Sequence, residues 1–80
     1  MKDLLTFVLS QILGNEDFAI EETISENGFV TLNATVKKSD MGLVIGKNGK
    51  TIKAIRSLLR TKATLEKIGF TIEVTEKSEG

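Results

Sequence analysis

"DMGLVIGKNGKTIKAIRSLL", residues 40–59, is the stretch of the chain that decides its fold. It contains a glycine, two polar residues and a second glycine at 46–49, and Gly-Lys-Thr at 49–51 is how a nucleotide-binding P-loop ends. A P-loop needs a glycine where this chain has Val44, a buried strand before it and a doubly wound parallel sheet around it. The 80 residues of the chain do not suffice for that sheet, so we expect no nucleotide hydrolysis from this turn.

Two helices are expected to flank the glycine turn. Ser39 and Asp40 are natural N-caps, so a short helix should begin near Met41 and run into the first glycine. A longer helix should follow over residues 50–67, with Gly69 as the residue that ends it. Its apolar residues recur at helical spacing: Ile52, Ile55, Leu58, Leu59 and Leu65.

One further helix and three strands complete the pattern. Apolar residues at helical spacing predict a first helix over roughly residues 2–13, ended by Gly14 and Asn15. Alternating apolar residues predict strands over residues 17–25, 29–37 and 70–75, although Glu22 occupies an apolar position of the first strand. The element order is therefore α-β-β-α-α-β.

The connections between these elements indicate a single small domain over residues 1–80. Asn27-Gly28 lies between two alternating runs and predicts a hairpin turn, because both residues can adopt positive φ. Residues 77–80 are expected to form a frayed tail. The order of elements predicts an α+β fold, in which a three-stranded sheet carries three helices packed on one face.

Charge is unevenly distributed along the chain. The formal net charge is zero, with 11 basic and 11 acidic residues. Between Lys37 and Leu65, however, eight basic residues accompany one acid, which gives this segment a charge of +7 and the rest of the chain −7. A strongly positive region attracts a polyanion even when the whole chain is neutral, so we expect a nucleic-acid partner.

Several function classes are disfavoured by composition. The chain has neither cysteine nor histidine, so it lacks the two side chains that most often serve in zinc sites and in nucleophilic or general-base catalysis. We expect no enzymatic activity, no metal and no cofactor. Residues 1–14 are too short and too polar to span a bilayer, so we expect a cytoplasmic protein without a membrane partner.

The glycine turn is well suited to a phosphodiester backbone. Gly46 and Gly49 have no Cβ to block an approaching backbone, and Lys47 and Lys50 flank the turn. Free amides at the start of the longer helix are expected to point outward with the positive end of the helix dipole. Thr51 is expected to belong to the first turn of that helix.

The bases of a bound nucleic acid are expected to reach an aliphatic groove, because the chain has no Tyr or Trp to stack on them. This groove would be lined by the second strand and by Leu43, Val44, Ile45 and Ile52. A separate side of the longer helix gathers cations within about 60° of one another, at 100° per residue. These cations are Lys53, Arg56, Arg60 and Lys67.

"VIGKNGKTIKAIRSLL" is similar to the V-I-G-K-x-G-x-x-I-x-x-I-R signature of KH domains, whose GXXG loop clamps the backbone of about four nucleotides. The order α-β-β-α-α-β matches the type II arrangement of that fold, and the whole chain resembles the small bacterial KhpA family of RNA-binding proteins. Residues 62–64 depart from the alanine-rich stretch common at that place, so helix packing or pairing there is expected to differ. Together with the loop, the groove and the cationic side of the helix, this resemblance gives the expected RNA-binding residues: Val44, Ile45, Gly46, Lys47, Asn48, Gly49, Lys50, Ile52, Lys53 and Arg56.

The resemblance implies a cytoplasmic protein that grips single-stranded RNA and acts as an RNA chaperone or post-transcriptional regulator. It also implies a homodimer, or a heterodimer with a larger KH-containing, KhpB-like protein, and a link to cell elongation and envelope homeostasis. The alternative is a protein-interaction or dimerisation module on a KH scaffold, whose RNA contact is incidental. The intact, cationic loop at 46–49 favours RNA binding, since a scaffold without that role tolerates acids or bulky residues there.

Overall fold

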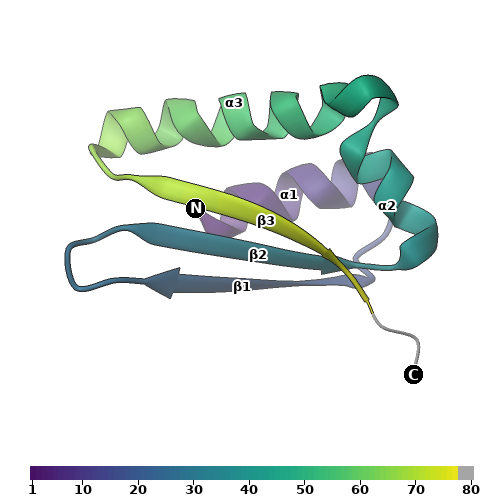
Figure 1. Ribbon diagram of the computed structural model, residues 1–80, viewed down its shortest axis with the longest axis horizontal. Helices are drawn as coiled ribbons and strands as arrows, with labels where there is room; N and C mark the ends of the chain where they lie inside the picture. Colours follow the sequence, from purple (N-terminus) through teal and green to yellow (C-terminus); the bar gives the residue numbers. More distant parts are fainter. Residues whose placement is uncertain (78–80) are drawn as a thin grey trace.

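The computed structural model describes residues 1–77 and confirms the expected α+β architecture (Figure 1). Its elements are α1 (Lys2–Leu13), β1 (Phe18–Ile24), β2 (Val30–Val36), α2 (Lys38–Ile45), the short 3₁₀ turn η1 (Lys47–Gly49), α3 (Lys50–Glu66) and β3 (Phe70–Glu76). The strands form one sheet in the order β1-β2-β3, in which β2 is antiparallel to β1 and parallel to β3. None of the described helices is long and apolar enough to cross a membrane.

The core lies between the sheet and the helices, which all pack on one face of the sheet (Figure 1). Strand β2 has a strict alternation of buried and half-buried residues because it is the central strand. Its buried side chains meet buried apolar residues of α1 and α3. The main members of this core are Leu5, Leu9, Val30, Leu32, Ala34, Val36, Ile55 and Leu59. The opposite face of the sheet is polar, with Glu21, Asn33 and Glu73 side by side in register.

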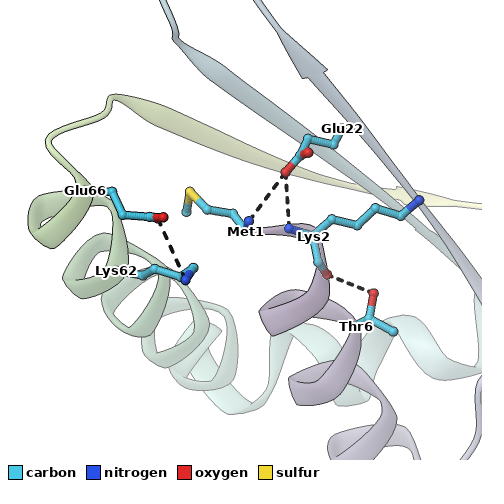
Figure 2. Close-up of polar contacts among 6 residues, drawn as sticks. All are labelled: Met1, Lys2, Thr6, Glu22, Lys62 and Glu66. Carbon is cyan, nitrogen blue, oxygen red and sulfur yellow. Dashed lines mark hydrogen bonds and ion pairs between the residues drawn. The ribbon is translucent and has the colours of Figure 1, made fainter.

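Glu22 occupies an apolar position of β1, and its carboxylate contacts the first residues of the chain at the start of helix α1. Its Oε2 accepts a hydrogen bond of 3.2 Å from the Lys2 amide and lies 3.6 Å from the amino nitrogen of Met1 (Figure 2). Negative charge at the first turn of a helix is favourable, since the helix dipole is positive there. The polar exception in the strand pattern is thus a tertiary contact between β1 and the start of α1.

The hairpin predicted between β1 and β2 forms. Of Asn27 and Gly28, only Gly28 adopts a positive φ, of 85°. The Gly28 amide donates to the Ser25 carbonyl at 2.9 Å, and the Phe29 amide donates to Ser25 Oγ at 3.0 Å. The loop spans residues 25–29, which allows the chain to reverse with one left-handed glycine.

Helix α2 begins earlier than the sequence indicated. It starts at Lys38, with Lys37 in extended conformation as the N-cap residue and no side-chain cap hydrogen bond. Asp40 therefore lies inside the first turn and does not cap it, and one of its carboxylate oxygens is buried without a hydrogen-bond partner among residues 1–77. The expected cap role of Asp40 was wrong because the backbone already turns at Lys37.

The end of α3 also differs from the expectation. Lys67, with φ 56°, adopts the left-handed conformation, and its amide donates back to the helix. Gly69 serves another purpose, because a Cβ built on it would lie 2.9 Å from the Phe29 ring. The absence of a side chain at Gly69 thus allows the hairpin loop to approach the chain entering β3.

The expected frayed tail falls largely outside the described residues, since residues 78–80 are not among them. Lys77 itself is attached, because its amide donates to the Val36 carbonyl at 2.7 Å. The last described residue therefore continues the pairing of β3 with β2.

Candidate nucleic-acid interface

The turn between α2 and α3, which we call the GXXG loop (residues 46–49), changes direction through three positive-φ residues. Gly46 has φ 76° and ψ 172°, Asn48 has φ 57°, and Gly49 has φ 74°. Asparagine is among the few residues besides glycine that visit the left-handed region readily. The sequence of the loop therefore matches its backbone at each strained position.

Two of the amides at the start of α3 are used within the loop. The Gly49 amide donates to the Gly46 carbonyl at 3.1 Å, and the Lys50 amide donates to the Lys47 carbonyl. The expectation of free amides at this helix start was thus wrong for Gly49 and Lys50. These two amides are therefore not free for an external anion, and a phosphate placed at the loop would be attracted mainly by its lysines and by the helix dipole.

The two glycines of the loop are not equivalent. A Cβ built on Gly46 would lie 2.2 Å from Thr51 Oγ1 and 2.8 Å from the Thr51 backbone nitrogen. A Cβ on Gly49 would meet only Ile52 Cγ2, at 3.9 Å. Gly46 is therefore required by close packing inside the loop, whereas Gly49 is favoured mainly by its backbone angles.

The polar residues expected at the interface lie together and face solvent. Lys47 and Asn48 lie in the loop itself, and the cations of α3 follow along the helix. All of them are exposed: Lys47, Asn48, Lys50, Lys53 and Arg56. Within residues 1–77, none of these cations takes part in an ion pair. Their charge is available to an external anion.

Two other cations of the basic segment are neutralised inside the molecule. Lys37 Nζ lies 2.8 Å from Asp17 Oδ2, and this hydrogen-bonded pair lowers the pKa of Asp17 and raises the pKa of Lys37 from their usual values. Lys62 Nζ lies 3.8 Å from Glu66 Oε2, one helical turn away (Figure 2). The free positive charge is therefore concentrated on the loop and on the cationic side of α3.

The aliphatic residues expected to line a groove separate into two groups. Leu43 is exposed, and Ile45 and Ile52 are half-buried beside the loop. Val44 is fully buried, with 0% exposure, and belongs to the core. Val44 thus serves the core, because the side of α2 that carries it packs towards the sheet, and its part in the groove stays a prediction.

Strand β3 adjoins the cationic side of α3, a feature that sequence reasoning missed. A cavity of about 320 Å³ lies between α3 and this edge strand, lined by Arg56 and Arg60 together with Phe70, Thr71 and Ile72. The expected second strand, β2, is central and is paired on both sides. The cavity residues of α3 and β3 come together only because β3 pairs in parallel with β2. No short stretch of the sequence predicts that pairing.

No metal site accompanies this surface: within residues 1–77, no group of three or more acidic side chains could hold an ion. The surface offers free cations, a tight backbone turn and a half-buried aliphatic strip. Such a combination suits an extended polyanion whose bases present flat, apolar faces.

The family model and the similar proteins found by comparison indicate the same family. The model of the KhpA/KhpB KH domain matches residues 2–75. The RNA-binding protein KhpA of Chlamydia trachomatis is 30% identical over 77 residues, covering 96% of this chain and 99% of the relative. KhpA of Chlamydia caviae is 32% identical over 76 residues, covering 95% and 97%, and KhpA of Thermotoga maritima is 36% identical over 59 residues, covering 74% and 79%. No solved structure matches the chain at a significant level.

Proposed function

The chain belongs to the KhpA/KhpB family of KH domains, and we propose that it binds single-stranded RNA by holding the sugar-phosphate backbone against the GXXG loop. The observation that carries this proposal is the group of exposed cations on the loop and α3, none of which is neutralised within residues 1–77. The curated relatives bear the name RNA-binding protein, in agreement with this role.

In the proposed complex, Lys47 and Lys50 attract the phosphates while the glycines let the backbone approach. The bases then lie towards Ile45 and Ile52, and Arg56 borders the cavity beside β3. Charge supplies most of the affinity and does not discriminate between sequences. We therefore propose that the protein selects single strands, which expose their bases, and selects weakly among their sequences.

The cellular role proposed here follows the family resemblance. We propose a cytoplasmic RNA chaperone or post-transcriptional regulator without enzymatic activity, linked to cell elongation and envelope homeostasis. A chaperone must release its RNA, and a single small domain that contacts about four nucleotides binds weakly enough to do so.

A salt titration tests the proposed contact between α3 and phosphate. Lys53→Gln should weaken binding of a short single-stranded RNA several-fold and reduce the slope of log affinity against log salt by about 0.7, since one phosphate contact is lost. Lys2→Gln, which removes an exposed cation from α1, should leave both quantities unchanged. Equal slopes for Lys53→Gln and the wild type, measured by fluorescence anisotropy, would contradict a phosphate contact at Lys53.

A second role, protein pairing, is favoured by the outer side of α3. Ala54, Leu58, Thr61 and Leu65 follow one another at helical spacing on exposed positions, and no charge lies in this stripe. Leu58 and Leu65 are 46% and 80% exposed, whereas the outward side of a solvated helix is normally charged. We propose that this outer stripe pairs with a second copy of the chain or with a larger KhpB-like protein, which would extend the RNA site.

Sedimentation of the purified chain, with and without RNA, tests this pairing. The wild type should self-associate, and Leu65→Lys should weaken self-association about tenfold, because a charge replaces an apolar anchor. Lys77→Gln, which changes an exposed residue directly after β3 and outside the stripe, serves as the control and should self-associate like the wild type. A monomeric wild type would contradict the homodimer, and unaltered association of Leu65→Lys would contradict the choice of surface.

A further inference from the structure

The inner side of the GXXG loop is occupied by the side chain of Thr51. This residue is the second of α3, directly after the loop. The position that a Cβ on Gly46 would take lies 2.2 Å from Thr51 Oγ1 and 2.7 Å from Thr51 Cβ. Thr51 Oγ1 and Cβ therefore occupy the space that a side chain on Gly46 would need, and they pack the start of α3 against the first residue of the loop.

The hydroxyl of Thr51 differs from those of Thr6 and Thr61 in its hydrogen bonding. Thr6 and Thr61 each donate to the carbonyl four residues earlier, at 2.8 and 3.1 Å, which is the usual bond for threonine in a helix. Thr51 makes no such bond within the described residues, and the carbonyl four residues before it, that of Lys47, accepts from the Lys50 amide. Its side chain is directed at Gly46 instead.

We propose that Thr51 is a positioning residue that holds the GXXG loop in its RNA-binding conformation through the shape of its side chain, without touching RNA. This inference rests on the proposed function of the loop. Gly46 has φ 76° and ψ 172°, a region that glycine populates readily but can also leave readily, since it has no Cβ to restrict its backbone. Packing by Thr51 selects this conformation at the entrance of the loop, so that Lys47 and Asn48 keep one arrangement.

The test compares Thr51→Ala, which removes both γ atoms, with Thr51→Val, which keeps the shape and removes the hydroxyl. Thr64→Ala is the matched control, since Thr64 lies exposed on the same helix away from the loop. Binding of a short single-stranded RNA should weaken about fivefold in Thr51→Ala, if the binding-competent fraction of loop conformers falls to about one fifth. Thr51→Val and Thr64→Ala should stay within about twofold of the wild type.

Two further readouts separate positioning from a phosphate contact and from general destabilisation. The salt slope of Thr51→Ala should equal that of the wild type, since no cation is removed. The Lys47 and Asn48 amide signals should broaden or shift in Thr51→Ala without RNA, while those of β2 stay unchanged. Wild-type affinity and unchanged loop signals in Thr51→Ala would overturn the proposal.

A direct role for the hydroxyl would give another pattern. Thr51→Val would then bind as weakly as Thr51→Ala while its loop signals matched the wild type, and this result would also overturn the positioning role. If the wild-type chain binds no RNA, the proposed function fails on its own, and the loop signals of Thr51→Ala in the free protein still decide whether Thr51 holds the loop.

Discussion

Replacing Lys47 and Asn48 together by aspartate is expected to abolish RNA retention, with a loss of affinity on the order of a hundredfold, because anions placed beside a phosphate cost several kcal/mol. The double substitution removes one cation and adds two anions at the tip of the GXXG loop. Both residues are exposed, so neither change disturbs the core. Filter binding or crosslinking to a short single-stranded RNA measures the effect.

The same double substitution should leave the fold intact. Asn48 has φ 57° and ψ 26°, and aspartate is one of the few other residues that accept this left-handed conformation. The circular dichroism spectrum and the midpoint of thermal unfolding are therefore expected to remain close to those of the wild type. A loss of binding with a preserved fold would identify the loop as the contact.

A matched control makes the same change in net charge at the other end of the molecule. Lys2→Asp combined with Asn27→Asp also changes the charge by the same amount, but at the start of α1 and in the β1–β2 hairpin, away from the turn between α2 and α3 (Figure 1). This control should bind RNA nearly as the wild type does, since most of its effect is screened over such a distance. Unchanged retention by the Lys47→Asp, Asn48→Asp variant, with its salt slope preserved, would contradict the loop assignment.

The fold was predictable because its elements are locally encoded. Helix α1 begins and ends where its apolar spacing and Gly14 indicate, and the alternation in β2 predicts a strand with one buried face. The ends of other elements depend on distant contacts. Gly69 is a typical helix terminator in the sequence, but the Phe29 ring requires the glycine there and Lys67 ends α3 instead. The contact between Phe29 and Gly69 joins residues 40 positions apart, and neither local stretch of sequence predicts it.

The candidate site was predictable to a similar degree and for the same reason. The GXXG loop and the cations of α3 follow from adjacent residues and helical periodicity, and the structure brings them together on one exposed surface. Neutralisation of Lys37 by Asp17 did not follow, because it depends on tertiary packing. The part of the surface contributed by β3 was missed because strand order is a property of the whole sheet.

The two glycines of the GXXG loop should differ sharply in their tolerance of a side chain. Gly46→Ala is expected to lower the free energy of unfolding by about 3 kcal/mol, since it combines a backbone conformation reserved for glycine with a clash against Thr51. Gly49→Asn should cost no more than about 1 kcal/mol, because Gly49 has φ 74° and ψ 15°, which asparagine tolerates. Urea denaturation of both variants measures the difference.

The difference between the two variants tests the packing of the loop. The two glycines cannot be told apart from their spacing in the sequence, and they differ in what surrounds them in the structure. A small domain has a total stability of about 0.05–0.15 kcal/mol per residue, so the loss expected for Gly46→Ala is a large part of the whole. Gly49→Asn leaves the contact between Gly46 and Thr51 intact, and it should therefore also retain most of its RNA binding. Equal stability of the two variants would show that the loop relaxes away from Thr51, in conflict with the 2.8 Å separation between the Gly46 Cβ position and the Thr51 backbone nitrogen.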